Sequence, residues 1–130
     1  MYLLDTNAVI DLFKERGRVA ERVLATPPGE IGLASVVLYE LEAGAAKSKR
    51  PEANRRQIAE MARLAHFVPF GMAEARASAR IRAMLEAQGR QIGPYDTLIA
   101  GTAMANGAVL VTHNVRELGR IDGLVVEDWF

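Results

Sequence analysis

The chain opens with an apolar segment, Met1–Leu4, that stops at a carboxylate, Asp5. The segment shows no polar alternation, which is typical of a strand covered on both faces, as in a parallel sheet with helices on either side. Thr6 or Asn7 can cap a helix that follows. Because ligands of open α/β sheets bind beyond the carboxyl ends of the strands, we expect Asp5 at the mouth of a cleft. The segment alone equally allows Asp5 to be a helix cap or a paired surface acid.

Further short apolar segments alternate with helical patterns, and this alternation predicts parallel strands joined by helical crossovers. The later strands are expected at residues 31–34, 67–70, 108–111 and 124–126. The main helices are expected within residues 8–13, 18–25, 36–45, 52–65, 71–88 and 97–106. We expect Asp11 to face solvent, Leu24 to point inward and Ser35 to be an N-cap.

The length of 130 residues suits a single domain, residues 1–130, with a core of its own. The chain has no cysteine, which excludes disulfides and thiolate zinc sites, and its two histidines, His66 and His113, lie far apart. No export signal is recognisable, and no apolar run approaches the roughly 18 residues of a membrane span. We therefore expect a soluble, cytoplasmic protein that does not bind membranes.

Sixteen basic and sixteen acidic residues cancel overall, but they are unevenly distributed. Residues 47–90 contain ten basic and four acidic residues, a net charge of +6, whereas residues 1–46 and 91–130 each have a net charge of −3. Thirteen of the basic residues are arginines, which bind phosphate in a bidentate way. The middle of the chain is therefore a candidate for contact with a nucleic-acid backbone, although ordinary solvated helix faces would look the same.

Three more polar residues stand at positions where a cleft is expected. Glu40 lies beside the apolar stripe of its predicted helix and is the acid expected to point inward, while Glu42 is about 200° away around the axis. Asp96 follows a Gly-Pro turn in the first turn of a helix, where the helix dipole alone would favour it by about 0.3–1 kcal/mol. Asn114 comes just after the fourth predicted strand.

These groups converge if the first and fourth strands are neighbours at the sheet centre. Two carboxylates about 5 Å apart repel by roughly 3 kcal/mol even at an effective dielectric of 20. Three ionised carboxylates therefore need a positive charge between them, and hard oxygen ligands select Mg²⁺ or Mn²⁺. An ion held in this way is the basis of metal-dependent phosphodiester cleavage.

Five segments, in order along nearly the whole chain, resemble the PIN domain and in particular VapC-type toxins. They are LLDTN, YELEAG, GPYDTLIA, LVTHNVREL and GLVVEDW. The resemblance implies a three-layer α/β/α sandwich with a central, mainly parallel sheet. It also implies an endoribonuclease that uses Mg²⁺ or Mn²⁺ and arrests translation by cutting structured RNA, such as tRNA.

The same resemblance assigns roles to particular residues. Asp5, Glu40 and Asp96 match the acids of the metal site, and Asn114 is expected to position water or metal in catalysis. Many PIN nucleases have an acid where Asn114 stands, and Glu117 is the candidate to replace it. The hydroxyls expected to support the site are those of Thr6 and Thr112, and the arginines expected to contact RNA are Arg80 and Arg82.

The implied partners are a second copy of the chain, a VapB-type antitoxin and the RNA substrate. The antitoxin surface is expected on helices within residues 8–13 and 36–64. His113 is expected to be an ordinary surface or core residue, and Trp129 and Phe130 to pack the C-terminal segment.

Other functions fit the sequence less well. An aspartyl-phosphate phosphatase usually needs an acid at position 7, which is Asn7, and a receiver domain needs a late lysine, whereas none follows Lys49. A non-catalytic binding module with the same fold remains the alternative.

Overall fold

The computed structural model describes residues 1–130 as five strands, seven α-helices and one short 3₁₀ helix. The strands are β1 (Tyr2–Leu4), β2 (Ile31–Ala34), β3 (His66–Val68), β4 (Val109–Val111) and β5 (Val126–Glu127). The helices are α1 (Thr6–Phe13), α2 (Val19–Leu24), η1 (Pro28–Glu30), α3 (Ser35–Ala46), α4 (Pro51–Leu64), α5 (Met72–Ala87), α6 (Pro94–Ala105) and α7 (Val115–Leu118). None of the helices combines the length and the apolar character that crossing a membrane requires.

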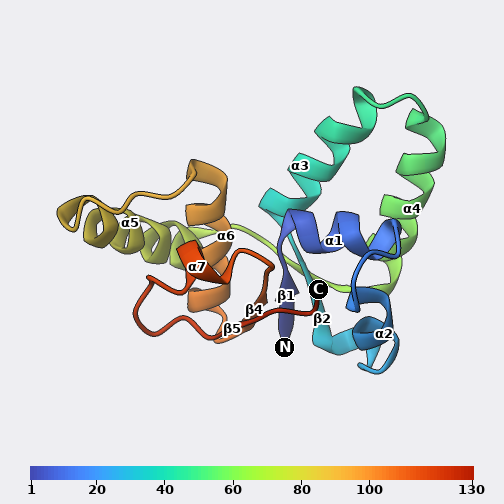
Figure 1. Cartoon of the computed structure of the whole chain (residues 1–130). Helices are drawn as coiled ribbons and strands as arrows, with labels where there is room; N and C mark the ends of the chain where they lie inside the picture. The colour runs from blue at the N-terminus through green and yellow to red at the C-terminus, as the bar shows by residue number, and fades with distance from the viewer.

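The strands form one sheet in the order β3-β2-β1-β4-β5, and every pairing is parallel. β1 lies at the centre, where Leu3 is opposite Gly32 of β2 and Leu110 of β4. Helices α1 to α4 lie on one side of the strands and α5 to α7 on the other (Figure 1). The predicted three-layer α/β/α sandwich is confirmed, as is the adjacency of the first and fourth strands.

The core is built on both faces of the central strand. Leu3 and Leu4 are both fully buried, and because successive side chains of a strand point to opposite faces, they fill different sides of the sheet. This explains why the first segment has no polar alternation. Burial of each such side chain contributes roughly 1.5–3 kcal/mol relative to exposure. Trp129 is also buried, with its ring 5.1 Å from that of Tyr2, which confirms that the C-terminal segment packs on the fold.

Three side chains are placed differently from the predictions made from sequence. Asp11 is only 9% exposed, not solvated, because it faces a cleft between α1 and the C-terminal segment. Leu24 is 87% exposed, because α2 ends there and nothing packs over its last turn. Ser35 is the first residue of α3 and Ala34 is the N-cap; the Ser35 hydroxyl instead accepts a hydrogen bond from the Phe70 backbone N–H at 3.2 Å.

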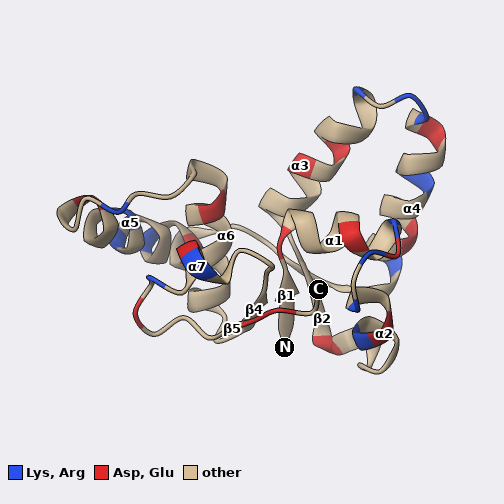
Figure 2. Ribbon diagram, viewed as in Figure 1, with Lys and Arg blue, Asp and Glu red and all other residues tan.

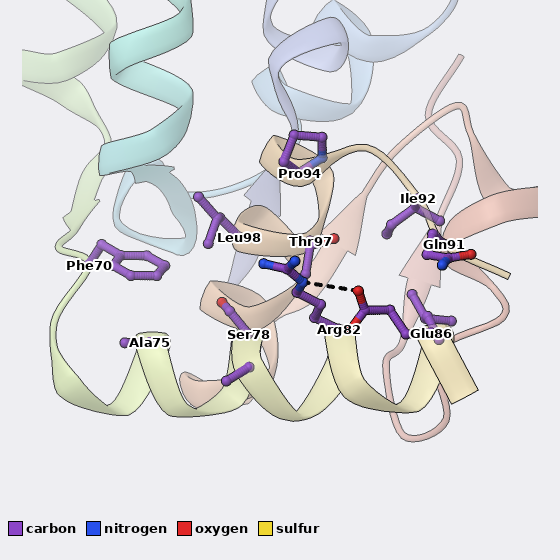
Figure 3. Close-up of a pocket in the computed structure, with 12 residues that line it drawn as sticks. Phe70, Ala75, Ser78, Arg82, Glu86, Gln91, Ile92, Pro94, Thr97 and Leu98 are labelled. Atoms are coloured by element: carbon purple, nitrogen blue, oxygen red, sulfur yellow. Dashed lines mark hydrogen bonds and ion pairs between the residues drawn. The ribbon is translucent and has the colours of Figure 1, made fainter. Parts of the chain in front are cut away.

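Helices α5 and α6 pack closely because Gly101 of α6 has no side chain. A Cβ atom added to Gly101 would lie 2.7 Å from the Cα and backbone N of Ser78 in α5, too close for atoms that are not bonded. The Ser78 hydroxyl is buried at this contact without a hydrogen-bond partner. Toward the start of α6 the two helices diverge around a cavity of about 590 Å³, which Arg82, Thr97 and other residues line (Figure 3).

We predict that Gly101→Ala destabilises the fold by about 1–3 kcal/mol, the usual cost of overpacking a core. Gly44→Ala is the matched control, because a Cβ atom at Gly44 of α3 would meet nothing within 4 Å. It should stabilise the protein by up to about 1 kcal/mol, since alanine is the better helix former. Urea unfolding of both variants measures the difference, and equal stabilities would contradict the packing argument.

Candidate active site

Asp5 connects the end of the central strand to the start of α1. Its backbone N–H donates to the Val111 carbonyl of β4 at 3.0 Å, so the sheet pairing continues up to this residue. Its side chain is the N-cap of α1, and Oδ1 accepts a hydrogen bond from the Ala8 N–H at 2.8 Å. The carboxyl group is therefore a helix cap and also lies at the carboxyl edge of the sheet, with one of its two oxygens free of this bond.

The surroundings of Asp5 disfavour its charge. Burial raises the pKa of the Asp5 carboxyl above its ordinary value, and the negative charges of Asp96 and Asp11 raise it further. Hydrogen bonds from the Thr112 hydroxyl and the Ala8 N–H oppose this increase in the pKa. Thr112 thus supports Asp5 directly, from the end of β4.

Glu40 of α3 is held against the start of α1. The Thr6 hydroxyl donates to Glu40 Oε1 at 2.6 Å, and both side chains are half-buried. This bond joins two helices that follow different strands, and it gives Thr6 a defined role as the residue that orients the Glu40 carboxylate.

Asp96 lies in the first turn of α6, which begins at Pro94 after the N-cap Gly93. Partial burial raises the pKa of Asp96, and the charges of Glu40 and Glu117 raise it further. The charge of Asp96 in turn acts on Asp5, so Asp96 is the acid that couples to both sides of the cleft.

The side chains of Asn114 and Glu117, which follow β4, are hydrogen-bonded to each other. The Asn114 side-chain amide donates to Glu117 Oε2 at 2.8 Å, and the Asn114 backbone N–H donates to the Thr112 hydroxyl at 3.0 Å. Asn114 therefore positions the Glu117 carboxylate, whose charge acts on Asp96.

The acidic side chains do not form a preassembled metal cage. No three acidic or histidine side chains converge closely enough to hold one ion among them. Their chemistry nevertheless fits a hard divalent ion, because every donor is an oxygen and two of the acids have raised pKa values that a nearby cation would lower.

Sequence reasoning missed several residues of the cleft beside Asp5. This cavity, of about 420 Å³, is also lined by Asn7, Asp11, Arg16, His113 and other residues. Asn7 and Asp11 are four positions apart and so share one face of α1, a spacing that could have indicated a second acid near Asp5.

His113 is exposed, as expected of a surface residue, and it also makes defined contacts. Its Nδ1 lies 3.0 Å from Asp128 Oδ2, and its ring lies 4.4 Å from that of Phe130, measured between centroids. This arrangement holds the imidazole at the mouth of the cavity that Asp5 lines. The contacts come from the C-terminal segment, which is distant in sequence.

The two arginines predicted to bind RNA lie on different sides of α5. Arg82 forms an ion pair with Glu86 at 3.4 Å and lines the cavity between α5 and α6 (Figure 3). Arg80 lines a separate small cavity with Met104 and Ile121. Neither residue lines the cavity that contains Asp5. Basic residues also gather at the tip between α3 and α4, away from the sheet (Figure 2).

Comparison with known families matches the PIN domain to residues 2–124. The chain belongs to the PIN domain family. A similar protein is the tRNA(fMet)-specific endonuclease VapC of Shigella flexneri, which is 38% identical over 98% of this chain and 97% of its own length. The ribonuclease VapC2 of Rickettsia felis is 32% identical over 99% of this chain and 98% of its own length. This PIN domain is thus one of the VapC ribonucleases, as the sequence motifs predict.

Solved structures agree with this assignment. The crystal structure of VapBC2 from Rickettsia felis, bound to a DNA fragment from its promoter, matches with a TM-score of 0.92 and 31% identity, over 99% of this chain and 98% of that one. DNA-bound VapBC from Salmonella typhimurium matches with a TM-score of 0.91 and 34% identity, with the same coverage. The fold predicted from the resemblance is therefore confirmed over almost the whole of this PIN domain.

We predict that Asp5→Asn stabilises the metal-free protein at neutral pH. Because the pKa of Asp5 is raised in the folded state, folding stability falls as the pH rises above the ordinary value of 3.8, and the full penalty is present above the folded pKa. Asparagine removes the charge and can still accept the Ala8 hydrogen bond. The melting temperature in EDTA should rise by a few degrees at pH 7, and the gain should vanish near pH 3.

The matched control for this prediction is Asp122→Asn, which changes an exposed acid outside the acidic cleft. It should give no pH-dependent gain. An Asp5→Asn variant that is less stable than wild type at pH 7 would contradict the proposed electrostatic penalty.

Proposed function

We propose that this PIN domain is an endoribonuclease that depends on Mg²⁺ or Mn²⁺, and that it is the toxin of a VapB–VapC pair. In this proposal it acts as a homodimer in the cytoplasm and cuts structured RNA. The observation that supports it best is the placement of three acids in a chain of the VapC group: Asp5 ends the central strand and caps α1, Glu40 is bonded to Thr6 at the start of α1, and Asp96 lies in the first turn of α6. Relatives named tRNA(fMet)-specific endonucleases make initiator tRNA the first substrate to test.

Each residue of the site has a defined task in this proposal. Asp5, Glu40 and Asp96 supply carboxylate oxygens to the ion, which when bound would neutralise charge on a phosphate and lower the pKa of a bound water. Thr6 holds the Glu40 carboxylate in place through its hydroxyl.

The other side of the cleft is organised from the end of β4. Asn114 holds the Glu117 carboxylate, and Thr112 donates to Asp5. Burial and then the charges of Glu40 and Glu117 raise the pKa of Asp96, and a bound cation would offset this penalty. The basic middle of the chain, including Arg80 and Arg82, would contact the RNA backbone away from these acids, which makes binding dependent on salt.

We predict that antitoxin-free protein cuts an initiator tRNA transcript only when Mg²⁺ or Mn²⁺ is present. Asp96→Asn should lower the rate at least a hundredfold, because it removes one carboxylate that holds the ion. EDTA should abolish cutting by the wild type. Gel analysis and sequencing of the fragment ends measure the activity and identify the cleavage site.

Asp122→Asn is again the matched control, and it should cut at the wild-type rate. Titration of Mn²⁺ followed by calorimetry gives a second measurement, since the ion should bind to the wild type and much more weakly to Asp96→Asn. No cleavage of tRNA, ribosomal RNA or total bacterial RNA by folded protein would favour the non-catalytic binding module instead.

An apolar groove on the opposite side of α1 from the acids is the proposed antitoxin surface. It has a volume of about 420 Å³ and lies between α1, α2 and α4, with Leu12, Phe13, Leu24, Met61 and Leu64 among its lining residues. Leu24 is 87% exposed and Leu64 is 49% exposed, so an apolar segment of a partner could bury both. The VapBC complexes of similar fold support a VapB chain as that partner.

We predict that Leu24→Glu and Leu64→Glu each weaken antitoxin binding at least tenfold, because each places a charge in a groove that the partner must desolvate. Val125→Glu is the control, since Val125 is 58% exposed but lies outside the groove. Calorimetric titration with a VapB antitoxin that neutralises the wild type measures the affinity. Equal loss in all three variants would exclude the groove as the specific surface.

A further inference from the structure

Two exposed tyrosines contact each other beside the acidic cleft. Tyr39 of α3 is 57% exposed and Tyr95 of α6 is 43% exposed. Their ring centroids are 5.7 Å apart with an angle of 51° between the planes, and their phenol oxygens are 3.4 Å apart. Single exposed aromatic rings are common, but a contacting pair from two different helices forms a larger apolar surface with a fixed orientation.

The position of the pair follows from the sequence. Tyr39 directly precedes Glu40 and Tyr95 directly precedes Asp96, so both rings stand one residue away from an acid of the site.

The pair is not explained by the packing of the fold. Neither tyrosine belongs to the hydrophobic core or to the partly buried residues that pack against it. The only side-chain hydrogen bond of each tyrosine is the one between the two phenol oxygens. The bond between the phenols restricts both rings, so a flat ligand that stacks on them would cost less side-chain entropy.

We propose that Tyr39 and Tyr95 form a stacking platform for an unpaired base of the RNA, next to the phosphodiester that is cut. This inference rests on the proposed nuclease function and identifies residues that bind its substrate. Single-stranded loops expose bases that stack on aromatic side chains, and each such contact is worth about 1–3 kcal/mol. An RNA whose phosphate reaches Asp96 and Glu40 must place a neighbouring nucleotide near these rings.

The platform favours RNA over a protein partner for a structural reason. It lies next to the acids that must remain open to the substrate, whereas the large apolar groove between α1, α2 and α4 is formed by other residues. Stacking also tolerates any base, so the platform would hold the strand in register without reading its sequence. It would thereby lower the KM for RNA with little effect on the chemical step.

The test compares leucine and phenylalanine variants of the pair. Tyr39→Leu and Tyr95→Leu remove the aromatic faces, while Tyr39→Phe and Tyr95→Phe keep them and remove only the bond between the phenols. Phe67→Leu is the matched control, because Phe67 is an exposed aromatic residue on β3, at the edge of the sheet away from the cleft. Circular dichroism and the melting temperature establish that each variant is folded.

Binding is measured without cleavage, in EDTA, with two probes. One is a fluorescein-labelled initiator tRNA transcript, and the other is a single-stranded oligoadenylate of about twelve nucleotides, a typical site size, with 2-aminopurine at its centre. Each leucine variant should weaken binding about tenfold, the double variant more, and the phenylalanine variants no more than twofold. Quenching of 2-aminopurine on binding should be lost only in the leucine variants.

Cleavage of the same transcript in Mn²⁺ separates the platform from the nuclease itself. A platform predicts that the leucine variants raise KM about tenfold and leave kcat nearly unchanged. Suppose that the wild type cuts the transcript and that the leucine double variant has an unchanged KM and unchanged binding. This result would overturn the platform and leave the nuclease intact. Absence of wild-type cleavage would overturn the nuclease, while the binding data would still decide whether the tyrosines stack on RNA.

A protein contact at the tyrosines is the competing explanation. Light scattering of the wild type and the leucine double variant decides between the two. An unchanged mass with weaker RNA binding supports the platform, whereas a change from dimer to monomer in the leucine variant assigns the pair to an interface between protein chains and overturns the proposal.

Discussion

The carboxylate of Asp5 lies in a buried position at the end of the central strand, where its charge is unfavourable. Burial and the neighbouring charges of Asp96 and Asp11 all raise its pKa. The fold opposes this penalty with only a few groups, namely the Ala8 N–H at the start of α1 and the Thr112 hydroxyl at the end of β4. The site is therefore held together by the sheet and its helices against the repulsion of its own side chains.

The repulsion among the carboxylates explains the roles of the uncharged polar residues beside them. Thr6 and Asn114 each hold one carboxylate by a single hydrogen bond, at 2.6 Å to Glu40 and at 2.8 Å to Glu117. These hydrogen bonds thus fix the orientation of carboxylates that repel one another. The residues that donate them lie near strand ends and helix starts, next to the acids.

Much of the fold could be predicted from the sequence because its strands are buried on both faces. β2 falls on the predicted residues 31–34, and the other strands overlap the predicted ranges with ends shifted by one or two residues. Convergence of the polar groups was expected only if the first and fourth strands are neighbours, and β1 does pair with β4. Periodicity correctly indicated these elements because it reflects burial, which the sheet imposes locally.

Side-chain environments set by distant segments could not be predicted in the same way. Asp11 looks like a solvated helix residue until the C-terminal segment covers its face of α1, and His113 gains its partner only when Asp128 is brought beside it. Leu24 was expected on the inward face of its helix, yet it is 87% exposed because α2 ends there and nothing packs over its last turn. The placement of the predicted site acids followed from strand topology, whereas their hydrogen-bond partners depended on contacts across the whole chain.

The pairing of β1 with β4 also determines when the cleft can exist during synthesis of the chain. Tyr2 pairs with Val109, so the central strand lacks one neighbour until most of the polypeptide has left the ribosome. Contacts between such distant segments form late, because closing the intervening loop costs entropy before any pairing is gained. Asp5 emerges first, but Asp96, Thr112 and Asn114 follow only near the end. The cleft that Asp5 lines is therefore assembled only after nearly the whole chain has been translated.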